Sequence, residues 1–200
     1  MNQITIDTYN QMALEYDLET KDFWSRFPRT FIDHFVELVR KGKVLDVGSG
    51  PGRDGVILKD AGLDITCLDA SLAMIELSKE KGLHSILGDF NDLPFANNSF
   101  GGVWSYTSLL HVPKIEVSKS LSEIRRVLKV GGIFGLGLIE GEEELYRESS
   151  GMNKLRWFSF YKKEEVENLL KKNGFEILYF ETFMPSKRNY LNFISKKVDN

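Results

Sequence analysis

A glycine-rich loop at the end of an apolar run constrains this chain more than any other feature. Residues 44–52 read Val-Leu-Asp-Val-Gly-Ser-Gly-Pro-Gly, so glycine occupies positions 48, 50 and 52. Glycine has no Cβ, which lets the backbone approach a ligand closely and expose its N–H groups. Asp46 stands two residues before the first glycine, at the carboxyl end of the expected strand, where ligands of open α/β sheets bind. The pattern predicts a ligand site that favours a cationic group.

The loop also satisfies a second pattern, because residues 50–55 fit the Gly-x-Gly-x-x-Gly motif of dinucleotide-binding proteins. In a nicotinamide-binding unit the glycines follow the strand directly and hold a pyrophosphate, whose negative charge Asp46 would repel. The stretch from Asp46 instead resembles motif I of the class I S-adenosylmethionine-dependent methyltransferases, Asp-x-Gly-x-Gly-x-Gly. The resemblance extends over most of the chain and implies that the acid helps to hold the methionine end of the cofactor, S-adenosyl-L-methionine.

A second acid, Asp69, follows the apolar run 65–68 and lies 21 residues after Gly48. This separation fits a strand–loop–helix–strand unit, which brings a second strand end beside the first. A carboxylate there can accept hydrogen bonds from both ribose hydroxyls. The alternative is a cap for the helix that begins near residue 71, although Ser71 could serve equally. Since NAD enzymes share this acid, Asp69 favours ribose binding without identifying the cofactor.

A third acid, Asp89, closes the expected strand 85–87 and lies 20 residues beyond Asp69. A lone aspartate here is more often a turn residue, but three acids at three successive strand ends favour binding. The methyltransferase resemblance implies that Asp89 accepts from the adenine amino group while Phe90, Leu72 and Met74 wall the ring. Together these arguments predict the following cofactor-binding residues: Asp46, Gly48, Ser49, Gly50, Gly52, Arg53, Asp69, Ala70, Ser71, Met74, Gly88, Asp89, Phe90 and Ser105.

Composition agrees with a single α/β domain over residues 1–200, which is long enough to bury a substantial core. No linker-like stretch divides it, and the apolar runs are far shorter than the ~20 residues of a membrane-spanning helix. The amino terminus lacks a basic-then-apolar signal sequence, so we expect a cytoplasmic protein with no membrane partner. The single cysteine, Cys67, excludes an intramolecular disulfide and is interpreted as a buried, inert thiol.

The net charge indicates which class of binding partner this chain favours. A net charge of −3, from 26 basic and 29 acidic residues, argues against nucleic acid. The chain also lacks the Asn/Asp-Pro-Pro-aromatic stretch that amino-methylating nucleic-acid enzymes usually carry after the fourth strand. The three histidines lie on different expected elements, so no metal site is expected. We therefore expect a small-molecule acceptor, with the oligomeric state left open.

Strands and helices alternate along the chain. Strands are expected near residues 43–47, 64–68, 84–87, 101–106, 132–139, 174–182 and 190–195, and helices near 53–61, 71–81, 115–128 and 162–172. Gly131-Gly132 is expected to end the third of these helices and open the fifth strand. The turn at 184–187 is too short for a right-handed parallel crossover, so the last two strands must form an antiparallel hairpin. The result is a doubly wound, seven-stranded, mostly parallel sheet with an antiparallel last strand, as in the class I methyltransferases.

The amino-terminal segment, residues 1–40, is expected to form a helical lid over a cofactor-binding sheet of residues 41–200. Tyr9 and Tyr16 lie two helical turns apart on one face, with a gap between them for a planar or apolar group. The run Tyr-Asn-x-Met-Ala-x-x-Tyr-Asp is similar to a segment that closes the acceptor pocket in small-molecule methyltransferases. The alternative is an amphipathic helix packed on the core.

Further residues are expected around the acceptor. Arg53 resembles a position that pairs with the cofactor carboxylate, the alternative being a solvent-facing arginine. His111 is either a general base for an acceptor hydroxyl or a structural histidine that caps its loop. Residues 156–161, within an insertion near 141–161, resemble an acceptor-facing segment or form a packed apolar flap. The predicted catalytic residue is His111, and the predicted substrate-binding residues are Tyr9, Tyr16, Trp24, Tyr106, His111 and Trp157.

The resemblance also implies a mechanism. The sulfonium of the cofactor makes its methyl carbon electrophilic, so the protein has to align an acceptor O, N, S or carbon atom and exclude water. Two alternatives stay open. One is another reaction of S-adenosylmethionine on the same fold, such as decarboxylation, cyclisation or aminopropyl transfer. The other is a non-catalytic S-adenosylmethionine-binding partner subunit, which would lack an open acceptor pocket.

Overall fold

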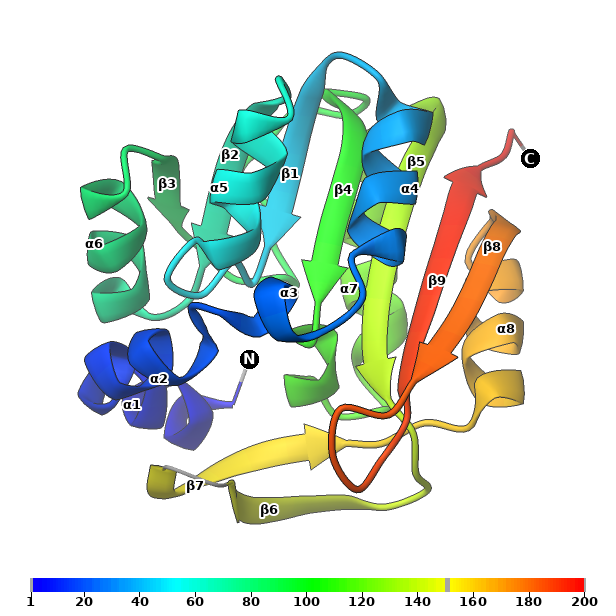
Figure 1. The fold of residues 1–200 in the computed structure, drawn as a ribbon. Helices are drawn as coiled ribbons and strands as arrows, with labels where there is room; N and C mark the ends of the chain where they lie inside the picture. Colours follow the sequence, from blue (N-terminus) through cyan, green and yellow to red (C-terminus); the bar gives the residue numbers. More distant parts are fainter. Residues whose placement is uncertain (1, 150–151, 200) are drawn as a thin grey trace.

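A seven-stranded sheet forms the centre of the computed structural model, which describes residues 2–149 and 152–199 (Figure 1). Its strand order is β3-β2-β1-β4-β5-β9-β8, and β9 runs antiparallel to both of its neighbours. The five strands from β3 to β5 are parallel. The predicted doubly wound sheet with a reversed last strand is therefore confirmed.

The strands of this sheet are β1 (Lys43–Val47), β2 (Asp64–Asp69), β3 (His84–Leu87), β4 (Phe100–Tyr106), β5 (Leu128–Ile139), β8 (Phe175–Phe183) and β9 (Tyr190–Lys197). The helices are α1 (Gln3–Gln11), α2 (Ala13–Thr20), α3 (Phe23–Arg26), α4 (Thr30–Val39), α5 (Arg53–Asp60), α6 (Leu72–Glu80), α7 (Val117–Val127) and α8 (Lys163–Lys172), with a 3₁₀ turn η1 (Leu109–His111). A separate hairpin consists of β6 (Glu144–Ser149) and β7 (Met152–Ser159).

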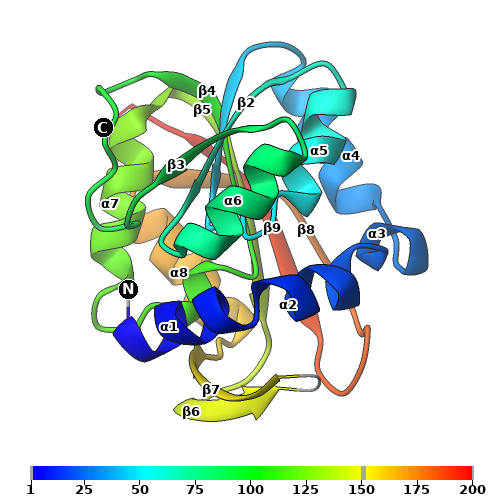
Figure 2. The ribbon, with the colours of Figure 1, turned by 90° about the vertical axis from the view of Figure 1, so that its left-hand side faces the viewer.

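Helices cover both faces of the sheet (Figures 1 and 2). On one face, Phe31, Ile32 and Phe35 of α4 are fully buried against strand residues that include Trp104. On the other face, α7 and α8 pack on the sheet through apolar residues such as Leu121. The central strands β1 and β4 are buried along most of their length, so most of their residues are apolar, as is typical of the inner strands of a parallel sheet.

The amino-terminal segment is divided between two locations. Helices α1 and α2 lie across the carboxyl ends of the strands, whereas α4 packs on the face of the sheet (Figure 1). The helical spacing of Tyr9 and Tyr16 predicted one continuous face, but the helix breaks at Met12. The two tyrosine rings meet edge to face with centroids 5.3 Å apart, so the predicted gap between them is absent.

Two other features differ from the sequence expectation. The insertion near residues 141–161 forms the β6–β7 hairpin, which lies beyond the carboxyl ends of the strands (Figure 1). Strand β5 begins at Leu128, before the glycine pair, because Leu128 pairs with Phe100 ahead of a register shift. Cys67 is buried, as expected.

Candidate functional site

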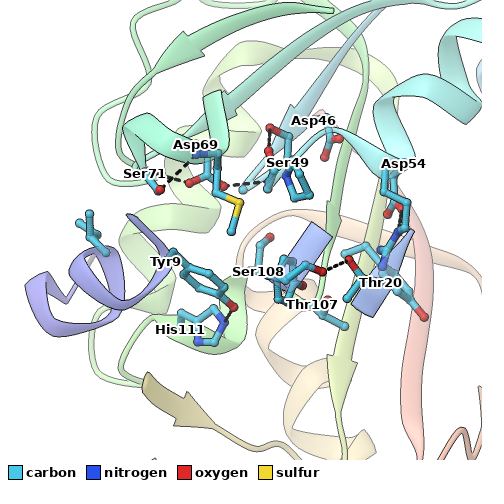
Figure 3. A pocket seen from close by; sticks show the side chains of 18 of the residues that line it. Tyr9, Thr20, Asp46, Ser49, Asp54, Asp69, Ser71, Thr107, Ser108 and His111 are labelled. Atoms are coloured by element: carbon cyan, nitrogen blue, oxygen red, sulfur yellow. Dashed lines mark hydrogen bonds and ion pairs between the residues drawn. The ribbon is translucent and has the colours of Figure 1, made fainter. Parts of the chain in front are cut away.

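A cavity lies at the carboxyl ends of β1, β2 and β4, and together with its opening to solvent it encloses about 640 Å³ (Figure 3). Residues of α1, α2, the glycine loop and the strand ends line it: Ile6, Tyr9, Tyr16, Thr20, Asp46, Gly48, Ser49, Gly50, Pro51, Arg53, Asp54, Asp69, Ser71, Met74, Phe90, Tyr106, Thr107, Ser108 and His111. Five of the predicted cofactor residues do not line it: Gly52, Ala70, Gly88, Asp89 and Ser105. We call this space the inner cavity.

Asp46 is a buried carboxylate at the end of β1, where it lines the inner cavity. Its Oδ2 atom is buried and has no hydrogen-bond partner among the described residues. Burial and the nearby Asp54 charge raise the pKa of Asp46 well above its usual value, while Arg53 opposes the shift. A cationic group in the cavity would stabilise the ionised form and satisfy this oxygen.

Asp69 lies at the end of β2, and its two carboxylate oxygens each hold one backbone donor. Oδ1 accepts from the N–H of Ser71 at 2.8 Å, and Oδ2 accepts from the N–H of Gly50 at 2.9 Å (Figure 3). Burial raises the pKa of Asp69, although hydrogen bonds from the backbone N–H groups of Ser71, Gly50 and Ala70 counteract the shift. A carboxylate has about four acceptor positions, so Asp69 retains capacity for a further donor.

The glycine loop is held by close packing that side chains would prevent. Gly48 has φ +71°, and a Cβ there would lie 2.3 Å from the Cβ of Ser108. The Ser108 hydroxyl in turn donates to the carbonyl of Val47 at 2.8 Å. Gly50 has φ +53° but faces open space, with only the Tyr16 ring near an added Cβ, at 3.8 Å. Backbone therefore forms part of the cavity wall at Gly50.

The first turn of α5 carries a buried ion pair beside the cavity. The Nε of Arg53 lies 2.6 Å from Oδ1 of Asp54. The same carboxylate accepts from the indole N–H groups of Trp24, at 2.7 Å, and Trp104, at 2.9 Å. Arg53 also lies over the Phe23 ring at 4.8 Å. Trp24, predicted to bind substrate, thus lies behind the cavity wall and holds Asp54.

The third predicted acid lies outside the inner cavity. Asp89 Oδ1 accepts from the N–H of Asn91 at 2.9 Å, in the turn that follows β3. Its neighbour Phe90 is fully buried and lines the cavity, together with Met74 from α6. These two apolar side chains form a wall near Asp69.

A chain of hydrogen bonds joins α1, η1 and β7. The Nη1 of Arg156 donates to the Tyr9 hydroxyl at 2.6 Å, and this hydroxyl lies 2.8 Å from Nε2 of His111 (Figure 3). The other ring nitrogen, Nδ1, lies 2.6 Å from the carbonyl of Trp157, which can only accept. The neutral ring therefore donates from Nδ1 and accepts the Tyr9 O–H at Nε2. Burial and the nearby Arg156 charge lower the pKa of His111 to about 3.

A second, larger space leads outward from the inner cavity. This outer chamber has a volume of about 1510 Å³, including its opening to solvent, and its lining includes Phe158 and Phe160 of the β7 segment. The two spaces share a junction formed by Tyr9, Tyr16, Thr20, Arg53, Tyr106, Thr107 and His111. The hydroxyl of Tyr106 is buried there without a hydrogen-bond partner in the described part of the chain. Trp157 lines neither space, since its indole N–H donates to Ser159 at 3.0 Å.

Sequence reasoning missed several residues of the site. Asp54 was overlooked because its partners Trp24 and Trp104 are distant in the chain, although its place in the first helical turn after the glycine loop was a signal. Thr107 has φ +52°, which is rare for a β-branched residue and typical of strained functional positions. No sequence signal marks that conformation. Ser105, which was predicted to bind the cofactor, does not line the inner cavity. Its hydroxyl oxygen lies 2.7 Å from that of Ser108.

Residues 2–149 and 152–199 contain no group of three or more His, Cys, Asp or Glu side chains placed to hold a metal ion. In the same residues, no helix has the length and apolar character needed to span a membrane.

Comparison with known proteins gives concordant results. Residues 45–136 match a family model described as a methyltransferase domain. The demethylmenaquinone methyltransferase of Renibacterium salmoninarum is 38% identical over 131 residues, which cover 62% of this chain and 54% of that protein. The chain thus spans about half the length of this curated relative. An uncharacterized protein of Methanocaldococcus jannaschii is 27% identical over 235 aligned positions, covering 96% of this chain and 90% of that one.

The fold also matches solved structures. A DhpI–SAH complex superposes with a TM-score of 0.78 and 19% identity, with 100% of both chains covered. At 19% identity this similarity shows the fold alone.

Proposed function

We propose that this chain is a class I S-adenosylmethionine-dependent methyltransferase that transfers a methyl group from S-adenosyl-L-methionine to an O, N, S or C atom of a small-molecule acceptor. The observation that carries the proposal is the buried Asp46 carboxylate at the glycine loop, whose Oδ2 has no hydrogen-bond partner among the described residues, beside Asp69, which retains acceptor capacity. One acid suits a cationic end of a ligand, and the other suits a pair of vicinal hydroxyls.

The residues of the inner cavity fit this cofactor. When bound, S-adenosylmethionine supplies a methyl group on a positively charged sulfur, which is inherently electrophilic. Asp46 would hold the cationic methionine end, and Asp69 would accept from the ribose hydroxyls. Phe90 and Met74 offer apolar walls to the adenine ring near Asp69. DhpI, which shares the fold, was solved with SAH bound.

A nicotinamide dinucleotide fits the same residues poorly. Its pyrophosphate would lie against the glycine loop, where Asp46 is buried with an unpaired oxygen. Ionised, this carboxylate would repel the phosphates; the opposite charge of a sulfonium or ammonium would be attracted.

At the junction of the two spaces, the chain's own side chains position the acceptor and exclude water. The Tyr106 hydroxyl is buried and unpartnered in the described residues, so an acceptor polar group can take it as a partner. His111 has a lowered pKa, and both ring nitrogens are engaged. We infer that His111 holds the Tyr9 ring in place rather than acting as a general base.

The outer chamber favours an enzyme over a non-catalytic partner subunit. A subunit that only binds the cofactor needs no second space, whereas a methyltransferase needs room for an acceptor next to the cofactor. The outer chamber opens from the junction and carries aromatic walls. The same space is required by other reactions of S-adenosylmethionine, so product analysis must distinguish them.

Calorimetry tests the cofactor. S-adenosylmethionine and its demethylated product S-adenosylhomocysteine (SAH) are expected to bind. At a hundredfold excess over Kd, each should stabilise the fold by about 2.7 kcal/mol, whereas NAD is expected to do neither. Tighter binding of NAD than of SAH would overturn the assignment. Incubation of the protein with methyl-labelled cofactor and fractionated metabolites then identifies the acceptor. Consumption of the cofactor without label in an acceptor product would indicate a different reaction on this fold.

A further inference from the structure

The outer chamber is strongly cationic. Its charged lining among the described residues consists of one acid and five cations, namely Glu19, Arg53, Arg147, Arg156, Lys187 and Arg188. Two of these cations are already neutralised, because Arg53 pairs with Asp54 and Arg188 pairs with Glu143. The other cations therefore determine which ligand charge the chamber favours.

Arg147 and Arg156 are the informative pair. Within the described residues, neither forms an ion pair. Arg156 is only 5% exposed, and its Nε atom is buried without a hydrogen-bond partner. In the described part of the chain, the side-chain hydrogen bond of Arg156 goes to the neutral Tyr9 hydroxyl. Leaving a cation buried without an anionic partner is costly, and a bound anion would remove that cost.

The hairpin places these two cations side by side. Arg147 of β6 pairs directly with Arg156 of β7 in the strand register. Like charges at directly opposite positions destabilise a β-ladder. Both guanidinium groups lie over the Phe158 ring, at 5.3 Å for Arg147 and 5.1 Å for Arg156. Cation–π contact holds the planar groups while leaving N–H groups for a ligand.

Two stacked, buried rings support the cations. The rings of Phe158 and Phe160 stack with centroids 5.8 Å apart and an interplanar angle of 6°. Both line the outer chamber. Arg156 also reaches the junction through its bond to Tyr9, so an anion beside it would lie at the end of the chamber nearest the inner cavity.

We propose, resting on the methyltransferase function above, that the methyl acceptor is an apolar or aromatic molecule bearing an oxyanion that Arg147 and Arg156 bind. A guanidinium fork matches the two oxygens of a carboxylate and equally those of a phosphate or phosphonate. The anion anchors the acceptor in the chamber, its apolar body contacts the half-buried apolar lining that includes Ile139 and Tyr190, and its nucleophilic atom extends to the junction.

Matched small probes test this binding. Benzoate and phenylphosphonate carry the two forms of oxyanion, and benzamide is the neutral counterpart of benzoate. We expect at least one anion to bind about tenfold more tightly than benzamide, corresponding to one charge-assisted contact, and to weaken as salt is raised. The stronger anion identifies the group. Equal binding of all three probes, or no detectable binding of any, overturns the proposal.

Variants assign the effect to the two arginines. Arg147→Met and Arg156→Met are expected to abolish the preference for the anion, and Arg156→Lys to restore part of it. Arg29→Met, at an exposed position before α4, is the control and should retain the preference. Since Arg156 is buried, Arg147→Met provides the test if the other variant does not fold. An unchanged anion preference in folded Arg147→Met protein overturns the proposal.

The probe titrations are made both with and without SAH, which separates this proposal from the function on which it rests. A wild-type protein that fails to bind SAH but prefers the anions would overturn the methyltransferase proposal and leave the anion site supported. A protein that binds SAH and shows no anion preference would overturn the anion-site proposal and leave the methyltransferase proposal supported.

Discussion

Asp69 carries the most direct test at the scale of single residues. Its carboxylate accepts from the N–H groups of Gly50 and Ser71 and retains acceptor capacity for a ligand. Asp69→Ala is expected to weaken SAH binding by about 1.5–3 kcal/mol, the range for hydrogen bonds that involve a charged group. Calorimetric titration of the folded variant with SAH measures this loss.

The control for this prediction lies on the same strand. Asp64 begins β2 and is exposed, so Asp64→Ala should bind SAH like the wild-type protein. An unchanged dissociation constant in folded Asp69→Ala protein would show that Asp69 only holds the glycine loop and the start of α6.

Residues of the inner cavity could be predicted from the sequence where their position along a strand alone determines their location. Residues at the carboxyl ends of parallel strands lie at one edge of the sheet, which placed Asp46 of β1 and Asp69 of β2 together. Asp54 could not be assigned in the same way, because its role depends on two indoles that arrive from α3 and β4. Tertiary contacts of this kind leave no local pattern.

At the scale of elements, the segment α1–α2 has the properties of a lid. It is attached chiefly by polar contacts: the Thr8 hydroxyl donates to the carbonyl of Leu155 at 2.7 Å, and Asp17 pairs with Lys81 at 2.5 Å. The only apolar side chain buried in either helix is Ala13. Segments with few buried apolar contacts open at low free-energy cost, and active-site lids belong to this class.

Hydrogen exchange tests the lid. Amides of α1 and α2 are expected to exchange faster than those of α4 in the free protein, because α4 is anchored by the fully buried Phe31, Ile32 and Phe35. Binding of SAH should slow exchange in α1 and α2, since Tyr9 and Tyr16 line the inner cavity. Exchange in α1 and α2 as slow as in α4 without ligand would instead identify them as ordinary core packing.

Truncation extends the same prediction. Removal of residues 1–20 should leave a folded sheet that still binds SAH, because the glycine loop, Asp46 and Asp69 lie outside the deletion. Methyl transfer should be lost, because the junction loses Tyr9 and Tyr16. Global unfolding of the truncated chain, or full activity, would contradict a lid.

The elements that the sequence failed to predict are those without a local signal. The strands β6 and β7 carry charged and aromatic residues in mixed order, and the sequence between them has only a Ser-Gly pair, a weaker hairpin signal than Asn-Gly or Asp-Gly. The break at Met12 occurs without proline or glycine at that position. Both features depend on packing against other parts of the chain.

At the scale of the whole molecule, the sheet was predictable because its local signals agree. The short turn after β8 required an antiparallel hairpin, and β8 and β9 pair in this way. The outer chamber was not predictable, because it brings together Tyr9, Arg156 and Arg188 from three distant segments. The acceptor-binding part of such a fold is built mainly from long-range contacts, so chain order alone did not predict it.

The last prediction concerns how stability depends on pH. His111 is buried, and its pKa falls from an ordinary 6.5 to about 3 because of burial and the Arg156 charge. Between these values the unfolded chain binds a proton that the folded chain excludes. The free energy of unfolding should therefore decrease as pH falls from 6.5 towards 3, by about 1.4 kcal/mol per pH unit for this one group.

Urea unfolding at pH 7, 6, 5 and 4 isolates this contribution when the wild-type protein is compared with His111→Gln. The variant lacks the group that titrates, so its unfolding free energy should fall less steeply below pH 6.5. Asp46 and Asp69 have raised pKa values, which give the opposite slope, but both proteins contain them and the comparison cancels their effect. His84→Gln, at an exposed histidine that begins β3, should run parallel to wild type. Parallel curves for His111→Gln and wild type would mean that the folded protein accommodates a protonated His111, and the neutral Tyr9–His111–Trp157 chain would then be the wrong description of the site.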